Sequence, residues 1–161
     1  MGPHGHAGLT LIIFSFLMMP FGYSFETIFI IILATALSSI PDIDLIYGWK
    51  HRDKTHNIGF ALVVGVGIAI ILFYTMHDIV IALTGFIAGF GGVISHLLGY
   101  IITYKSFAPL APFSKRKIAL RYCKADDKKV NIVLMIGGAL AFTLYMLVVT
   151  GNLEVIIQNY F

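Results

Sequence analysis

Charged residues are scarce in this chain of 161 amino acids. Lys, Arg, Asp and Glu make up 12% of it, whereas an ordinary soluble domain carries about 25% charged residues. Hydrophobic residues make up 58%, against about 45–50% in soluble domains. Several long stretches contain no charged residue. The composition therefore argues against an ordinary soluble domain and predicts one integral membrane domain.

The chain also lacks most of the motifs that would suggest a particular chemistry. Its single cysteine, Cys123, excludes an internal disulfide and a cysteine-rich zinc site. The sequence contains no P-loop, no Gly-x-Gly-x-x-Gly and no Gly-x-Ser-x-Gly elbow. It contains no known nucleic-acid-binding module, so we expect no nucleic-acid partner. No basic region precedes the first apolar run, so we expect no cleaved signal peptide.

Five apolar segments follow one another along the chain, and the first two are short. A helix that crosses a bilayer needs about 20 residues. We expect spans at roughly 9–21, 25–40, 58–76, 79–104 and 130–150. The expected fold class is all-α: a polytopic membrane protein of about five transmembrane helices, in a single domain over residues 1–161.

Glycine and proline mark one turn and one packing face between these helices. Pro20 and Gly22 lie between the first two segments and predict a tight turn in a helical hairpin. Gly85 and Gly89, in the fourth segment, form a small-xxx-small pair that lets a second helix approach closely. We expect this face to pack within the chain, and it would also permit a homodimer.

The basic residues predict the orientation of the chain in the membrane. With five spans, the N-terminal segment, residues 42–56 and the basic loop 105–129 share one side, and all 11 Lys and Arg residues lie on it. Four or six spans would divide them between both sides. The positive-inside rule makes this side cytoplasmic. We therefore expect a multi-pass protein of the cytoplasmic membrane with its N-terminus in the cytoplasm.

Side chains that can bind a metal gather on the same side, from four predicted helices. One lies before the first span, two follow the second span, two lie near the start of the third, and one lies in the fourth span, about 13 Å from its end. They are His6, Asp42, Asp44, His51, His56 and His96.

The spacing of these residues predicts how they converge. Asp42 and Asp44 follow Pro41, which favours an extended segment in which residues two apart point to the same side. His51 and His56 would lie about 140° apart on a continuous helix. They can converge only if His51 lies in the loop before the third helix.

Two further predictions concern the start of the third helix and one face of the fourth helix. Asp53 or Thr55 is the expected N-cap of the third helix. His96, Tyr100 and Thr103 are spaced i, i+4, i+7 and share a face of the fourth helix. An ionisable group inside a membrane is costly and usually functional, so we expect His96 to do more than pack.

Imidazole and carboxylate ligands without thiolate suit zinc first, with manganese and iron as alternatives. One or two divalent ions are expected, and more than four ligands favours two. A pair of metal ions clamps the attacking and leaving oxygens of a displacement, typically at phosphorus. Since no redox or group-transfer motif is present, hydrolysis is the expected chemistry. Asp44, Tyr100 and Thr103 are the candidate catalytic residues.

Five motifs together carry a resemblance to a known family. They occur in order up to about residue 120, and they are "GHAG" (5–8), "PDIDL" (41–45), "HRDKTHN" (51–57), "SHLLGYIIT" (95–103) and "FAPLAPFSKRKI" (107–118). The sequence resembles the YdjM-like family of membrane-bound, predicted metal-dependent hydrolases, which is distantly similar to zinc-dependent phospholipase C. The resemblance implies a metal site made of His6, Asp42, Asp44, His51, His56 and His96.

The chain departs from the family pattern at two positions. Asn57 stands where the family usually has Ser, and Tyr100 stands where it usually has an Asp four residues after His96. Three interpretations of Tyr100 remain open. The site is active with Tyr100 as a weaker ligand or proton donor, it binds only one metal, or it is inactive.

Three classes of function remain open at this stage. The first is a hydrolase of a phosphate ester or phospholipid headgroup, with Arg52, Lys115 and Arg116 as candidate substrate-binding residues. The second is a non-catalytic, metal-stabilised scaffold. The third is a metal or proton transporter, although the other side of the chain has few polar groups and no inverted repeat. Membrane lipid is the expected partner, and the basic segment "SKRKIALRYCKADDKK" (114–129) suits anionic headgroups.

Overall fold

The computed structural model describes residues 1–48, 51–153 and 158. Over these residues the chain is helical, with isolated β-bridges and no strand. Five helical segments are long and apolar enough to cross a membrane. The prediction of an all-α, polytopic membrane fold is therefore confirmed. The helices are α1 (Pro3–Met18), α2 (Phe25–Leu37), the short α3 (Ile43–Ile46), α4 (Ile58–Met76), α5 (Ile79–Ile101) and α6 (Lys128–Val149).

The first helix begins six residues before the predicted span. Pro3 stands in its first turn, where the missing N–H has no helical partner to lose and the fixed φ suits a helix. As a result, His6 lies on α1 and not before it. The hairpin to α2 turns at Gly22, whose φ is 71°. Ser24 then caps α2 by accepting a hydrogen bond from the backbone of Thr27.

The segment after α2 differs from its prediction. Residues Ile40–Asp42 form a short 3-10 helix that runs directly into α3. The expected extended segment at Asp42 and Asp44 was therefore wrong. Pro41 opens this 3-10 turn because its fixed φ also suits the first turn of a helix.

The start of α4 also differs in its cap. Asn57, and not Asp53 or Thr55, is the N-cap, and its side chain accepts a hydrogen bond of 2.9 Å from the backbone of Phe60. The same amide donates to the carbonyls of Asp53 and Lys54. Asn57 thus ties the loop before α4 to the start of the helix. His51 lies in that loop, as predicted.

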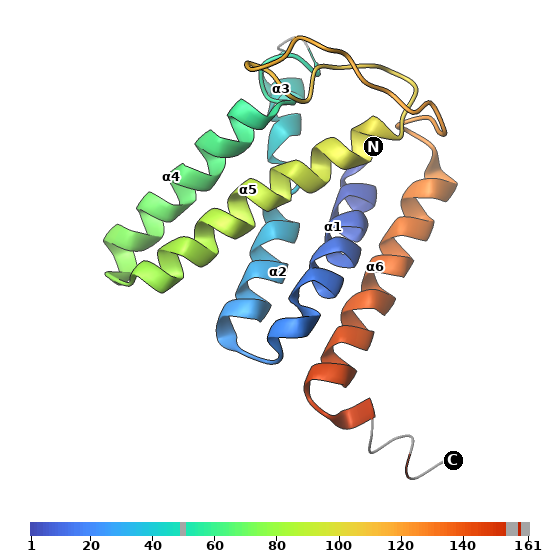
Figure 1. Cartoon of the computed structure of the whole chain (residues 1–161). Coiled ribbons are helices and arrows are strands. Elements are labelled where there is room, and N and C mark those ends of the chain that lie inside the picture. The colour runs from blue at the N-terminus through green and yellow to red at the C-terminus, as the bar shows by residue number, and fades with distance from the viewer. Residues whose placement is uncertain (49–50, 154–157, 159–161) are drawn as a thin grey trace.

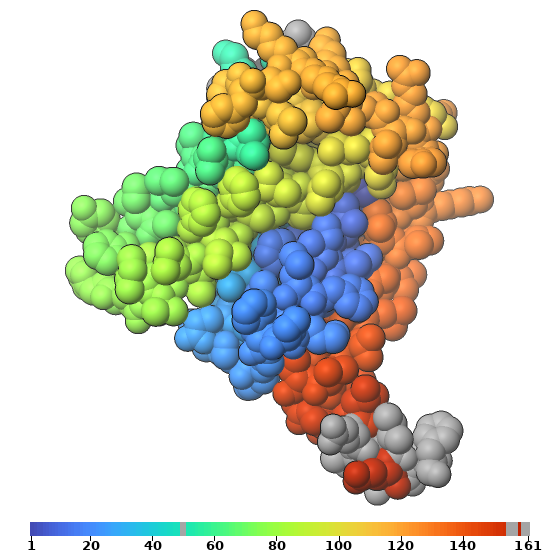
Figure 2. All heavy atoms as spheres, in the orientation of Figure 1, coloured from blue at the N-terminus to red at the C-terminus, as the bar shows by residue number. Residues whose placement is uncertain are grey.

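Helix α5 is central and α1 joins it to the rest of the bundle. α5 packs against α4, α2 and α1, and α1 packs against α6 and α2. Figure 1 shows that the segment between α5 and α6 crosses the end of the bundle where α4 begins. In Figure 2 the same segment forms a cap over that end. α6 ends on the opposite side of the bundle from the N-terminus, as an odd number of spans requires.

Glycines allow these helices to approach closely. A Cβ added to Gly92 of α5 would lie 2.6 Å from the carbonyl oxygen of Ala34 in α2. A Cβ added to Gly89 would lie 3.2 Å from the Cα of Gly65 in α4. The predicted packing role of the glycine face of α5 is therefore confirmed within the chain. Gly8 of α1 lies against the backbone of α6 in the same manner.

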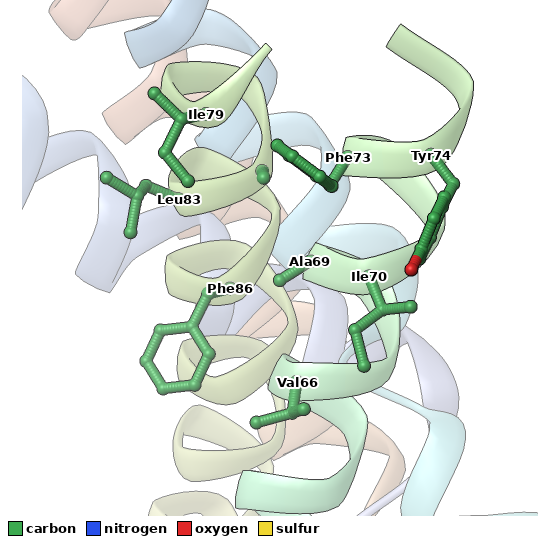
Figure 3. A pocket seen from close by; sticks show the side chains of 9 residues that line it. Val66, Ala69, Ile70, Phe73, Tyr74, Ile79, Leu83 and Phe86 are labelled. Atoms are coloured by element: carbon green, nitrogen blue, oxygen red, sulfur yellow. The ribbon is translucent and has the colours of Figure 1, made fainter. Parts of the chain in front are cut away.

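The outer surfaces of the bundle are apolar. A hollow of about 370 Å³ lies between α4 and α5 near the turn that joins them, far from the polar end. Figure 3 shows side chains that line it, among them Val66, Ile70 and Phe73 of α4 and Leu83 and Phe86 of α5. Its only polar side-chain group is the hydroxyl of Tyr74. A hollow with this lining suits lipid chains and offers no chemistry.

We expect Gly8→Ala to destabilise the protein by about 1–3 kcal/mol, as overpacking of a tight core does. The new Cβ would collide with the backbone carbonyl of Leu134 in α6, which cannot rotate away. Gly67→Ala in α4 is the matched control, because no atom lies within 4 Å of its added Cβ. Thermal unfolding in detergent measures both. Equal stability of the two variants would contradict the close α1–α6 packing.

Candidate metal centre

All six predicted metal ligands meet at the polar end of the bundle. They form two groups, and within each group one ligand atom per residue lies within 4.8 Å of the others. Asp42 belongs to both groups and so joins them. The groups are Asp42, Asp44, His51 and His56, and His6, Asp42 and His96.

The cluster is mostly buried, and two of its members keep some exposure. His6, His56 and His96 are fully buried, and Asp44 is 1% exposed. The side chain of His51 keeps 23% exposure. Asp42 keeps 16% exposure, so a small molecule from solution would reach the cluster at His51 and Asp42.

A backbone carbonyl fixes the proton on His96. Its Nδ1 lies 2.7 Å from the carbonyl oxygen of Ser38, and a carbonyl can only accept a hydrogen bond. Nδ1 therefore carries the proton. The Nε2 of the neutral ring then presents a lone pair to the cluster, as in a metal-binding histidine.

A short chain of hydrogen bonds fixes His56 in the same tautomer. The hydroxyl of Thr55 donates to the carboxylate of Asp44 at 3.2 Å. Its oxygen lies 3.0 Å from Nδ1 of His56 and, with its proton already used, accepts from it. Nε2 of His56 therefore also presents a lone pair to the cluster.

These lone pairs meet each other and a carboxylate. The two Nε2 atoms of His56 and His96 lie 3.2 Å apart. They lie 3.3 and 3.5 Å from the same oxygen of Asp42. Three electron-rich atoms this close repel each other unless a cation or proton lies among them. Two ligands of a tetrahedral zinc ion at about 2.0–2.1 Å are roughly 3.3 Å apart, so the spacing suits a metal.

His6 supplies a further observation that fits a metal. Among the described residues, neither of its ring nitrogens has a hydrogen-bond partner of ordinary geometry, although both are buried. Its Nε2 lies 4.0 Å from the Asp42 carboxylate, and its ring stacks on His96 with centroids 3.8 Å apart. Thr10 donates to the carbonyl of His6 and bonds Ser95 of α5, which holds this part of α1 against α5.

Asp44 accepts several hydrogen bonds in the cluster. Nδ1 of His51 lies 3.0 Å from one of its oxygens, and the other oxygen accepts from the backbone of Arg52 and from Thr55. These contacts suit a carboxylate that orients His51 and His56. The metal-ligand and catalytic roles of Asp44 stay predictions.

Tyr100 lies in the middle of the histidines, on the face that it shares with His96. Its hydroxyl donates to Asp42 at 3.0 Å and lies 3.2 Å from Nε2 of His51. Its ring is 2% exposed, and its centroid lies 4.8–5.6 Å from the centroids of all four cluster imidazoles. The phenol therefore fills space that a shorter Asp side chain would leave open.

Arg52 covers the outer side of Tyr100. Its guanidinium lies 4.1 Å from the centre of the Tyr100 ring and donates to the hydroxyl of Thr103 at 3.1 Å. The Thr103 hydroxyl donates in turn to the carbonyl of Tyr100. Burial lowers the pKa of Arg52, and Tyr100 and Asp42 partly oppose that shift. An arginine guanidinium stays protonated in proteins.

The other predicted substrate residues do not line the cavity beside His51. Lys115 and Arg116 are exposed on the segment between α5 and α6. Their predicted role in substrate binding stays a prediction. The sequence reasoning missed Ser38 and Thr55 as orienting groups. The Thr55–His56 pair was visible in the motif, but the Ser38 contact acts through a backbone carbonyl and has no sequence signal.

The fold and the site define a class: a multi-pass helical membrane protein with a buried His/Asp cluster that could hold a metal ion. The model of the YdjM inner membrane protein family matches residues 1–158. The chain belongs to this family. Comparison with curated proteins and with solved structures finds no match.

We expect Thr55→Val to weaken zinc binding by about 10- to 100-fold, as loss of an orienting partner typically does. Valine keeps the shape of Thr55 but cannot accept the proton of His56 Nδ1. Thr55→Ser is the matched control and should bind zinc like the parent protein. Competition with a chromophoric chelator measures the affinity, with His56→Ala as the variant that should lose it. Zinc affinity unchanged in Thr55→Val would contradict the assigned tautomer.

Proposed function

We propose that the protein is a membrane-embedded, metal-dependent hydrolase of phosphate esters. The observation that carries this proposal is the meeting of the His56 and His96 Nε2 atoms with the Asp42 carboxylate. Three electron-rich atoms in a buried site suit a divalent cation better than a structural role. The exposed side of the cluster faces the polar segments, where a headgroup would approach.

The ligand types suggest which residues would hold the metal. Asp42, His56 and His96 are the nearest set, and His6 would complete it from α1. Asp42 belongs to both groups, so it would contribute a ligand whichever group holds the metal. Zinc is proposed first because the set combines imidazole with carboxylate and lacks thiolate. A bound divalent metal supplies a Lewis acid for a phosphoryl oxygen and lowers the pKa of water.

The remaining residues would position the reactants. Arg52 brings a fixed guanidinium to the exposed side, where it can bind a phosphate oxygen. The Tyr100 hydroxyl is placed to donate a proton or hydrogen bond beside Asp42. Asp44 would hold His51 and His56 in their orientations.

A second candidate function follows from the position of Tyr100. Its ring fills the centre of the cluster, and its hydroxyl donates a hydrogen bond to Asp42. A centre filled in this way suits a metal-stabilised scaffold with weak or no turnover. The two candidates share the metal and differ in whether Tyr100 permits substrate to reach it.

We expect Tyr100→Asp to raise phosphate-ester hydrolysis by about tenfold or more, on the scale at which acid–base and electrostatic groups act. The shorter side chain would open the centre and restore the carboxylate of the family pattern. Tyr100→Phe is the matched control, because it keeps the ring and removes only the hydroxyl. Turnover of phosphomonoesters and phospholipids is measured together with bound metal by mass spectrometry.

The outcomes separate the two candidates. Faster hydrolysis in Tyr100→Asp that is lost when His96→Ala is added supports the hydrolase. Metal binding without turnover in every variant supports the scaffold. A protein that binds none of zinc, manganese, iron or cobalt would refute both.

We further propose that the metal centre faces the cytoplasm, with the N-terminus on the same side. The basic residues of the α5–α6 segment support this orientation. A cysteine at Ser114, in a Cys123→Ser background, should react with a membrane-impermeant maleimide in inverted vesicles and not in intact cells. A cysteine at Asp78, in the α4–α5 turn, should show the opposite pattern. Labelling of Ser114→Cys in intact cells would reverse the proposed orientation.

A further inference from the structure

A second, polar cavity lies beside the metal cluster. It has a volume of about 270 Å³ and is enclosed by the loop before α4 and by the segment after α5. His51 belongs both to its lining and to the metal cluster. The cavity therefore opens onto the exposed side of the cluster. Its polar lining residues are His51, Arg52, Asp53, Lys105, Ser106 and Lys117.

The lining carries more positive than negative charge. Arg52, Lys105 and Lys117 face one carboxylate, that of Asp53. Within residues 1–48, 51–153 and 158, neither Lys105 nor Lys117 has an ion-pair partner. Three cations around one cavity create a positive potential that attracts anions. An anion among them would relieve their mutual repulsion.

Backbone hydrogen bonds join the segments that carry these cations. Phe107 and Ile118 exchange two backbone hydrogen bonds, of 3.3 and 2.9 Å, which bring the segments carrying Lys105 and Lys117 together. The carbonyl of Pro109 accepts from the backbone of Ile58 at 2.8 Å, which ties this segment to the start of α4. The cavity is thus a built feature of the fold and not a gap between free loops.

Arg52 connects the cavity to the metal cluster. Its φ of 66° is unusual for a residue other than glycine, and such strain often marks a functional position. The guanidinium is held over Tyr100 and donates to Thr103 and to the carbonyl of Lys105. It is therefore fixed between the cations of the cavity and the centre of the cluster.

We propose that this cavity binds the phosphate group of the substrate, with Lys105 and Lys117 as its specificity-determining cations. The assignment to a substrate rests on the proposed hydrolase function, whereas the anion site itself does not. A phosphate group offers three acceptor oxygens and up to two negative charges, which suit one guanidinium and two ammonium groups. Lys115 and Arg116, the basic residues predicted from the sequence to bind substrate, do not line the cavity.

The size and position of the cavity limit what it can hold. Pockets for whole drug-sized ligands span about 300–1,000 Å³, so this one takes a phosphate with a small headgroup and no acyl chain. The same segment exposes Phe113 and Tyr122, which are 77% and 78% exposed and suit the membrane interface. The phosphate therefore belongs either to a lipid headgroup or to a small soluble ester.

Binding to the full-length protein in detergent tests the proposal by calorimetry. The probes are inorganic phosphate, dihexanoyl phosphatidic acid and dihexanoyl phosphatidylcholine. The variant Lys105→Gln/Lys117→Gln should bind inorganic phosphate and phosphatidic acid about tenfold or more weakly, as expected for the loss of charge-assisted hydrogen bonds. The matched control Lys115→Gln/Arg116→Gln removes the same charge from the same segment and should bind like the parent. Circular dichroism confirms that both variants keep their helices.

The outcomes separate the source of the phosphate. Much tighter binding of phosphatidic acid than of inorganic phosphate assigns a lipid headgroup. Equal affinities assign a soluble phosphate ester. Phosphatidylcholine, whose phosphate is paired with a cation in its own headgroup, should bind weakest in both cases.

The same experiment is repeated after removal of metal by a chelator. Lysine-dependent phosphate binding in a protein with no hydrolytic activity would leave the anion site standing and refute only the proposed function. Equal weakening in both double variants, or no saturable binding of any probe, would overturn the anion site. Hydrolysis restored by Tyr100→Asp but unaffected by Lys105→Gln/Lys117→Gln would remove the cavity from substrate binding.

Discussion

The convergence of two imidazole nitrogens on one carboxylate is the constraint on which the polar end of this protein depends. His56 and His96 can present their Nε2 lone pairs to Asp42 only while their Nδ1 protons are held elsewhere. Those protons are held by the carbonyl of Ser38 and the hydroxyl of Thr55. The end of α2, the loop before α4 and the last turns of α5 must therefore stay together.

Close helix packing makes that arrangement possible in a protein with few polar contacts. Inside a membrane the hydrophobic effect does not drive helices together, so packing of small residues and interhelical hydrogen bonds must do so. Gly92 lets α5 approach α2, and Gly8 lets α1 approach α6. The bond between Thr10 and Ser95 holds α1, and with it His6, against α5. The packing of the apolar half of the bundle therefore keeps the residues of its polar end together.

Much of the fold and of the candidate site could be predicted from sequence. The lengths of the apolar segments and the distribution of the basic residues predicted five spans. The six side chains predicted as metal ligands lie close together in the structure. The predictions of local backbone structure were wrong where one residue type is compatible with two local conformations. Pro41 was expected to favour an extended segment and opens a 3-10 turn, and the cap of α4 is Asn57, not Asp53 or Thr55. Asn57 suits this cap because a side-chain amide caps a helix as well as a hydroxyl does.

By itself the sequence determined the number of spans, the side that carries the basic residues and which His and Asp side chains come together at the polar end. These follow from composition and from spacing along single helices. Only the tertiary structure decided the tautomers of the histidines, the burial of Tyr100 among them and the presence of Lys105 and Lys117, and not Lys115 and Arg116, in the lining of the polar cavity. Each of these depends on contacts between residues far apart in the chain, often through a backbone carbonyl, and a carbonyl is the same in every residue.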